Sequence, residues 1–232
     1  MELWPGGPLF RQAAQAPLGT DSVLLADFAA GKAACGIDLG CVSGILTLLL
    51  LTGAASLRMT GLELREESAR IARENLEQNG LSDRGRILTG DIRQVREILR
   101  PGSFDLCVAN PPYFPRGSGA SAPDPARAEA REESACTLDE LCAAAAWLLP
   151  TGGRFCAVHR PERLSELFCT MTKYGLEPKR LRLCCHRPGA APNLVLIEGR
   201  RGGKPGLKIE PVLYLTDPEG RETEEVKRIY HR

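Results

Sequence analysis

The chain has 232 residues, of which 43 % are hydrophobic and 25 % are charged, and its formal net charge at pH 7 is +1, as in an ordinary globular protein. No apolar run reaches the roughly 18 residues of a membrane span, and the N-terminus lacks the basic region and apolar core of a secretory signal, so we expect a cytoplasmic protein without membrane contact. Nine cysteines without Cys-x-x-Cys spacing and only three histidines predict reduced, mostly buried thiols and no metal site.

Apolar runs and helical patterns alternate along the chain. A lead-in over 1–19, irregular or hairpin-like, precedes a helix capped by Thr20, and a loop rich in Pro, Gly and Ser occupies 115–128. Runs of β-forming residues predict strands at 33–39, 55–62, 86–88, 104–109, 153–159, 179–186 and 193–199. Apolar periodicity with helix start and stop signals predicts helices at 20–31, 44–51, 66–78, 93–99, 138–149 and 161–174.

This alternation predicts an α/β fold with a mainly parallel sheet and helices on both faces. The sequence shows no internal repeat and no clear linker. We therefore expect a single domain over 1–232. It consists of the lead-in and first helix (1–31), a core (32–200) and a C-terminal extension (201–232).

A glycine-rich turn, 38–44, lies between the first expected strand and the next helix. Glycines at such a turn let the backbone approach a ligand closely. Glu63 ends the second strand about 20 residues further on, where an acidic residue binds ribose hydroxyls. Asp91 follows the third strand and offers an acceptor for an adenine amino group. The combination suits an adenosine-containing cofactor without choosing a dinucleotide over S-adenosylmethionine.

The strand at 104–109 stops at Asn110-Pro111-Pro112-Tyr113, because proline cannot donate to a sheet ladder and favours an extended residue before it. An exocyclic nitrogen is a poor nucleophile, since its lone pair is delocalised. Asn110 Oδ1 and the Pro111 carbonyl can accept both of its hydrogens and so localise that lone pair. Tyr113 can stack on a planar substrate. The pattern indicates alkylation of an amino or amide nitrogen.

Charge is unevenly distributed. Residues 1–150 hold 14 basic and 19 acidic side chains, a net of 14 − 19 = −5, whereas residues 151–232 hold 16 and 10, a net of 16 − 10 = +6. The basic side chains that stand out in this C-terminal third are Lys179, Arg180, Arg182, Arg187, Arg200, Arg201, Lys204 and Lys208. They favour either a polyanion-binding surface or an ordinary solvated one, and composition leaves both open.

The order Asp-Leu-Gly-x-x-x-Gly, acidic residue, Gly-Asp and Asn-Pro-Pro-Tyr resembles the class I S-adenosylmethionine-dependent methyltransferases that act on amino groups. Three flanking segments, 19–25, 130–132 and 176–180, resemble the bacterial family that methylates adenine N6 in a valine tRNA, in the anticodon loop. The resemblance covers almost the whole chain. The flanking segments point to this family, because the two main motifs are common to many methyltransferases.

The resemblance implies a Rossmann-like, mostly parallel sheet of seven strands with one antiparallel strand. It implies S-adenosylmethionine as cofactor, S-adenosylhomocysteine as product, and tRNA as partner. Because residues 151–232 hold the basic surplus, we expect the tRNA to bind through this C-terminal third. The residues that the resemblance implies for the cofactor are Thr20, Asp38, Gly40, Cys41, Gly44, Glu63, Leu64, Asp91, Ile92 and Asn110. Those it implies for catalysis are Asn110, Pro111, Pro112 and Tyr113.

One position departs from the family pattern: Val42 stands where the family's loop usually has glycine, and a β-branched residue resists positive φ. Three other functions are considered. A protein-glutamine methyltransferase would use the same Asn-Pro-Pro-Tyr clamp, but that family usually carries an extra helical domain at the N-terminus. An RNA-binding protein that has lost its cofactor through Val42 would leave Asn110 and Tyr113 without a role. A nicotinamide oxidoreductase would leave the same motif unexplained.

Overall fold

The computed structural model describes residues 1–13, 18–111 and 136–231. Pro112, Tyr113 and the expected loop at 115–128 lie outside the described residues. The lead-in forms a short hairpin, with Glu2 bridged to Leu9 in antiparallel fashion.

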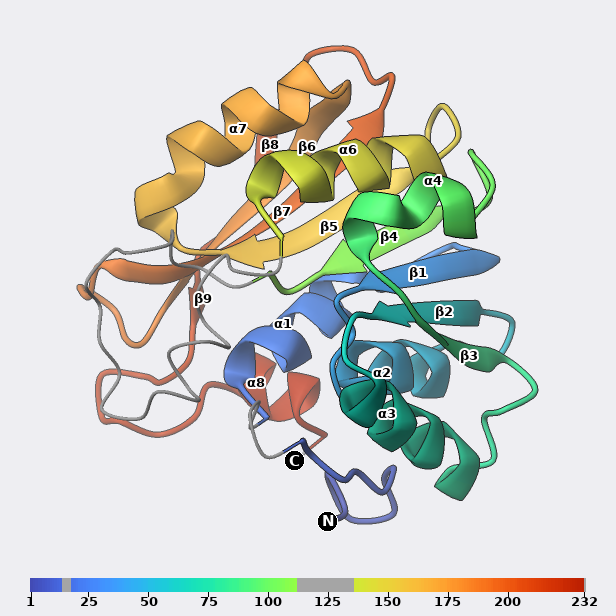
Figure 1. The fold of residues 1–232 in the computed structure, drawn as a ribbon. Coiled ribbons are helices and arrows are strands. Elements are labelled where there is room, and N and C mark those ends of the chain that lie inside the picture. The colour runs from blue at the N-terminus through green and yellow to red at the C-terminus, as the bar shows by residue number, and fades with distance from the viewer. Residues whose placement is uncertain (14–17, 112–135, 232) are drawn as a thin grey trace, which may run out of the picture.

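The described residues form one nine-stranded sheet in the order β3-β2-β1-β4-β5-β7-β6-β8, with β9 also paired to β6 (Figure 1). Its strands are β1 (Cys35–Leu39), β2 (Arg58–Glu63), β3 (Gly85–Thr89), β4 (Leu106–Ala109), β5 (Arg154–His159), β6 (Leu176–Cys185), β7 (Pro192–Arg201), β8 (Lys208–Ile209) and β9 (Leu213–Tyr214). Strand β7 is antiparallel to both β5 and β6. The other pairings are parallel.

The expected seven strands with one antiparallel member correspond to β1–β7. Two-residue strands β8 and β9 come from the C-terminal extension, where no element was expected, and they add to the free side of β6. The strands expected at 179–186 and 193–199 are shorter than the observed β6 and β7. Antiparallel pairing of these two strands continues through a register shift near Pro178 as far as Arg201. Cross-strand hydrogen bonds therefore extend both strands beyond their apolar runs.

The helices are α1 (Thr20–Ala29), α2 (Ile45–Gly53), α3 (Glu66–Gln78), α4 (Val95–Ile98), α6 (Leu138–Leu148), α7 (Leu164–Lys173) and α8 (Glu224–Ile229), with 3-10 turns η1 (Ile92–Gln94) and η2 (Pro161–Arg163). Helix α3 has the predicted bounds. Helices α4 and α7 are shorter than expected because each is preceded by a 3-10 turn. Thr137 caps α6 through a capping box with Glu140, as its sequence predicts. Helix α1 begins at Thr20, so its N-cap is Gly19 and not Thr20.

Helices cover both faces of the sheet (Figure 1). Leu24, Leu48 and Val226 belong to the apolar cluster that joins α1, α2, α3 and α8 to one face. Leu141 and Met171 belong to the cluster that joins α4, α6 and α7 to the other face. Burial on both faces explains why the central strands are continuous apolar runs.

All nine cysteines are free and six of them are buried, which confirms the expectation of reduced, mostly buried thiols. Among the residues that the structure describes, no helix has both the length and the apolar character needed to cross a membrane.

Candidate active site

Strands β1 and β4 are parallel neighbours at the point where the strand order reverses, with Asp38 paired to Val108. Both strands end within two residues of that pair, so that the backbone leaves the sheet at Gly40 and at Asn110. We call the side where β1, β2, β4, β5 and β6 end the carboxyl edge, and the side where they begin the amino edge. Crevices at such a reversal on the carboxyl edge are where open α/β sheets bind ligands. The glycine turn and the Asn110 motif therefore meet there.

Asn110 is held by a residue from a distant part of the chain. Its Nδ2 donates a hydrogen bond of 2.9 Å to Ser22 Oγ on helix α1, and Ser22 is buried. This bond sets the direction of the side-chain amide, with Oδ1 as its acceptor end. Helix α1 thus orients the amide that the sequence assigns to a substrate nitrogen.

The glycine turn has three residues with positive φ: Gly40 at 75°, Val42 at 48° and Gly44 at 77°. A Cβ at Gly44 would lie 3.1 Å from Ala72 Cβ on α3, so glycine also allows α2 and α3 to pack closely. The buried side chain of Asn75 donates to the Ser43 carbonyl at 2.8 Å. The predicted conflict at Val42 is therefore present in the structure, since a β-branched residue occupies the left-handed region.

Glu63 is buried at the end of β2. Its Oε2 accepts the Val42 N–H at 3.0 Å, and its Oε1 accepts the Arg65 N–H at 3.0 Å. One carboxylate thus joins the glycine turn to the start of α3. Each carboxylate oxygen can accept a further hydrogen bond, so Glu63 can bind a ligand hydroxyl while it holds the turn.

Asp38 is fully buried beneath the glycine turn. Its Oδ2 accepts hydrogen bonds from Thr47 Oγ1 at 3.0 Å and from the Thr47 N–H at 3.3 Å. Its Oδ1 is buried without a hydrogen-bond partner among the described residues. Burial, with a smaller contribution from the nearby charge of Glu63, raises the pKa of Asp38 to about 7 against the opposing effect of the Thr47 bonds. An unsatisfied buried carboxylate oxygen is costly unless a ligand supplies a donor or a cation.

Comparison with known proteins identifies the family. Residues 18–171 match the family model described as methyltransferase small domain. The chain is 34 % identical over 190 residues to the tRNA1(Val) (adenine(37)-N6)-methyltransferase of Porphyromonas gingivalis, a match that covers 79 % of this chain and 74 % of that protein. The chain belongs to this methyltransferase family.

A second relative agrees with this assignment, and two solved structures share the fold. The tRNA1(Val) (adenine(37)-N6)-methyltransferase of Tolumonas auensis is 31 % identical over 210 residues, covering 90 % of this chain and 85 % of that protein. A predicted O-methyltransferase from Agrobacterium tumefaciens has a TM-score of 0.74 at 20 % identity, covering 91 % of this chain and 96 % of that one. A geranyl diphosphate C-methyltransferase from Streptomyces coelicolor, solved with S-adenosylhomocysteine, has a TM-score of 0.57 at 14 % identity, covering 78 % and 76 %. These structures confirm the Rossmann-like methyltransferase fold.

The remaining residues that the sequence assigns to the methyltransferase cofactor differ in their exposure and in the bonds they make. Asp91 caps η1 and is bound by Arg93 through its N–H and its guanidinium, and hydrogen bonding from the Arg93 side chain lowers the pKa of Asp91. Ile92 Cδ1 lies 3.9 Å from the position a Gly40 Cβ would take. Leu64 is 44 % exposed, so its side chain is open to contact with a ligand.

Two other assigned residues offer less to a ligand. Cys41 is buried and its Sγ packs against Gly61 on β2, so only its backbone faces the turn. Burial raises the pKa of the Cys41 thiol, which therefore stays protonated. Thr20 is half-buried at the start of α1, two residues before Ser22.

The basic side chains of the C-terminal third mostly bind other parts of the protein. Arg180 pairs with Glu198 and Glu210, Arg182 pairs with Glu225, and Arg200 pairs with Glu198. Arg201 donates to the backbone carbonyls of Ala146 and Tyr174. These contacts satisfy the guanidinium groups internally.

The direction of β7 places Arg200 and Arg201 away from Asn110. Because β7 is antiparallel, Arg200 pairs with Arg154 at the start of β5, on the amino edge. Asn110 lies on the carboxyl edge, at the other end of the strands. An RNA bound over Asn110 therefore does not meet Arg200 and Arg201 at the same edge.

Sequence reasoning missed three residues of the site: Ser22, Thr47 and His159. His159 ends β5 on the carboxyl edge and its Nδ1 accepts the Arg160 N–H at 2.8 Å. Burial, followed by the nearby charge of Arg163, lowers the pKa of His159 to about 4, so its imidazole is neutral at pH 7. Ser22 lies in the segment that carries the family resemblance, but nothing in that segment's pattern pairs it with Asn110.

Proposed function

We propose that this protein transfers a methyl group from S-adenosylmethionine to N6 of an adenine in tRNA, the reaction named in its relatives from Porphyromonas gingivalis and Tolumonas auensis. The observation that carries the proposal is the position of Asn110. It lies at the tip of β4 next to the glycine turn of β1, and Ser22 fixes its direction. An oriented amide acceptor beside a cofactor turn is what methylation of an exocyclic amine needs.

The residues of the turn fit the cofactor. Asp38 Oδ1 is a buried acceptor without a partner among the described residues, suited to the ammonium of a methionine moiety. Glu63 keeps acceptor capacity for ribose hydroxyls beyond the two backbone bonds it makes. Leu64 and Ile92 offer apolar surface to the adenine. When bound, the cofactor supplies an electrophilic methyl group on a positively charged sulfur.

Asp91 is proposed to bind the adenine amino group, although Arg93 now occupies both of its oxygens. A carboxylate has about four acceptor positions. It can accept one more hydrogen bond at the side away from Arg93, so the ion pair need not open.

The protein's part in the reaction is to position the target amine. Asn110 Oδ1 and the Pro111 carbonyl would accept its two hydrogens and direct the lone pair toward the methyl group. Holding two reacting groups in line replaces a bimolecular encounter, and such positioning supplies a large part of the rate enhancement. Pro112 and Tyr113, which lie outside the described residues, are proposed to complete the clamp and to stack on the base.

The tRNA is proposed to bind through the part of the C-terminal third that reaches the carboxyl edge. Arg187 lies in the turn between β6 and β7, where β6 ends, and its side chain is exposed. Because a single flipped base leaves most of the affinity to phosphate contacts, cations at this edge are needed.

Two measurements test the proposal. Calorimetry with S-adenosylhomocysteine should show saturable binding, and labelled methyl groups from S-adenosylmethionine should enter bulk tRNA and not protein. Absence of cofactor binding would favour an RNA-binding protein without transferase activity. Label in protein and none in tRNA would favour the protein-glutamine methyltransferase.

A further inference from the structure

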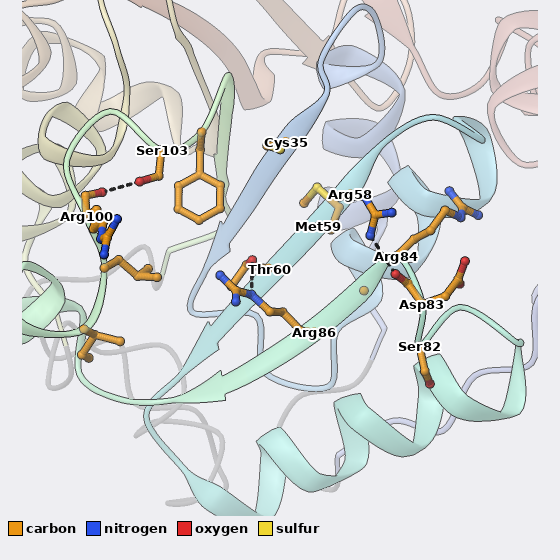
Figure 2. A pocket seen from close by; sticks show the side chains of 14 residues that line it. Cys35, Arg58, Met59, Thr60, Ser82, Asp83, Arg84, Arg86, Arg100 and Ser103 are labelled. Atoms are coloured by element: carbon orange, nitrogen blue, oxygen red, sulfur yellow. Dashed lines mark hydrogen bonds between the residues drawn. The ribbon is translucent and has the colours of Figure 1, made fainter.

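A cavity lies on the amino edge, away from the proposed active site. It has a volume of about 590 Å³ and is lined by the starts of β1, β2 and β3 and by the segment before β4 (Figure 2). Met59 lines this cavity near the start of β2, and Glu63 ends the same strand. At about 3.3 Å per residue, roughly 13 Å separate the two positions. The cavity is therefore separate from the cofactor turn.

Positive charge dominates the lining. The charged side chains that line the cavity are Arg58, Arg84, Arg86, Arg100 and a single acidic residue, Asp83. No ion pair joins any of these arginines to a carboxylate within the described parts of the chain. Arg58 donates to the backbone carbonyl of Asp83 at 3.0 Å and not to its carboxylate. Four guanidinium groups thus surround one cavity with almost no compensation.

One of the four has a structural role. Arg84 donates to the carbonyls of Leu51 and Ala54 at the end of α2 and to that of Leu57 just before β2. Guanidinium groups commonly satisfy the last carbonyls of a helix in this way. Arg84 is therefore excluded from the binding group proposed below.

The other three arginines retain most of their donors. Among the described residues, Arg58 makes the one bond to Asp83 O, Arg86 donates to Thr60 Oγ1 at 3.0 Å, and the guanidinium of Arg100 has no partner. All three side chains are exposed. A guanidinium fork matches the oxygens of a phosphate and binds them in pairs.

The rest of the lining is partly apolar, and its uncharged polar side chains are Thr60, Ser82 and Ser103. Met59 and Phe104 are buried at the cavity wall, and Ile98 is 37 % exposed beside them. Figure 2 shows the labelled arginines at several sides of the space and Met59 between them. A cavity of this size, with apolar walls and a few convergent polar groups, is typical of a small-ligand site.

We propose that this cavity binds a nucleoside phosphate, with the phosphate held by Arg58, Arg86 and Arg100 and the base against Met59, Phe104 and Ile98. The ligand is either a free nucleotide or a nucleotide of an RNA chain, since both present the same chemistry. The site goes beyond the proposed methyl transfer and does not depend on it.

The test is calorimetric titration of ADP and, separately, of a ten-nucleotide oligoribonucleotide. The protein is saturated with S-adenosylhomocysteine, so that ADP does not occupy the adenosine site at the carboxyl edge. The variant is R58Q/R86Q/R100Q, which removes three charges and leaves Arg84 in place. The matched control is R11Q/R70Q/R221Q, in which three arginines that form exposed ion pairs elsewhere are removed with the same change in net charge. R100Q alone serves if the triple variant does not fold, because this guanidinium makes no bond that the fold needs.

The triple variant is expected to bind the probe at least about tenfold more weakly than wild type, while the control changes by less than about twofold. Loss of ADP binding identifies a free nucleotide as the ligand. Loss of oligoribonucleotide binding with no ADP binding to the wild type identifies RNA. Equal affinities of the triple variant and the control, or no saturable binding of either probe to the wild type, overturn the proposal. The measurement involves no methyl transfer, so its failure is distinct from failure of the proposed function.

Discussion

Ser22 and Asn110 are 88 residues apart in the chain, yet Asn110 Nδ2 donates to Ser22 Oγ at 2.9 Å. The bond joins helix α1 to the tip of β4. It orients an amide that the proposed reaction uses, so Ser22 acts as a positioning residue.

Replacing Ser22 with alanine should lower kcat by roughly fivefold, because one neutral hydrogen bond contributes about 1 kcal/mol. The affinity for S-adenosylhomocysteine should not change, since the Ser22 hydroxyl is bound to Asn110. Ser22→Thr keeps the hydroxyl and should recover most of the turnover. Equal losses of kcat in the alanine and threonine variants, measured in a tRNA methylation assay, would mean that Ser22 contributes to packing and does not position Asn110.

Cofactor binding should release a proton near neutral pH. Burial raises the pKa of Asp38 to about 7, so the carboxyl is largely protonated at pH 6.5, and a bound ammonium group would favour its ionised form. Affinity for S-adenosylhomocysteine should therefore fall as the pH is lowered below about 7. The pKa of His159, lowered by burial to about 4, excludes that residue as the source.

Calorimetry at pH 6.5 in two buffers of different ionisation enthalpy measures the released proton. The binding enthalpy should differ between buffers by an amount corresponding to about three quarters of a proton for a pKa near 7. Asp38→Asn should remove the difference. Identical enthalpies in both buffers for the wild-type protein would refute a role for Asp38 at the ammonium.

Val42→Gly should stabilise the fold by about 1 kcal/mol. Valine is strained at the positive φ of this position, and removing that strain outweighs the conformational entropy that glycine loses on folding. It should also tighten binding of S-adenosylhomocysteine, since it removes a side chain from the turn. Val42→Ala keeps a Cβ and should show little of either effect. Weaker binding by the glycine variant would show that this turn is adapted to valine.

Arg187→Glu should weaken tRNA binding and flatten its salt dependence by about 0.7 in the log–log slope for a phosphate contact on a single strand. Arg200→Glu is the control, because Arg200 lies on the amino edge and pairs with Glu198. Filter binding over a range of salt concentrations compares the two. An unchanged slope for Arg187→Glu together with a flattened one for Arg200→Glu would place the RNA at the amino edge.

The sequence predicts the parts of this site that depend on strand order. Parallel strands end at one edge, so the apolar runs before Asp38, Glu63 and Asn110 are enough to bring these three side chains together. Helix α3 is predicted to the residue, because its apolar periodicity and its Asn-Gly stop agree. Local patterns suffice where the neighbours are set by the fold class.

Other features depend on contacts that no local pattern contains. The direction of β7 is one example, since an apolar run does not indicate whether its strand is parallel or antiparallel to its neighbours. Because β7 is antiparallel, Arg200 lies on the amino edge. The bond from Asn110 to Ser22 is another, because it depends on where α1 packs. Glu63 is predicted to bind a ligand, but it also accepts the Val42 N–H, and only the geometry of the turn reveals that role.

The most direct test of the account is mass analysis of the nucleosides of unmodified tRNA treated with S-adenosylmethionine and either the wild-type protein or Asn110→Ala. The wild type should produce N6-methyladenosine. The alanine variant should lose about 10²–10³-fold in rate, which corresponds to the roughly 2.7–4 kcal/mol of one positioned polar contact in the transition state, while binding S-adenosylhomocysteine as before. Turnover by Asn110→Ala close to that of the wild type, or a methyl group on any atom other than adenine N6, would contradict the account.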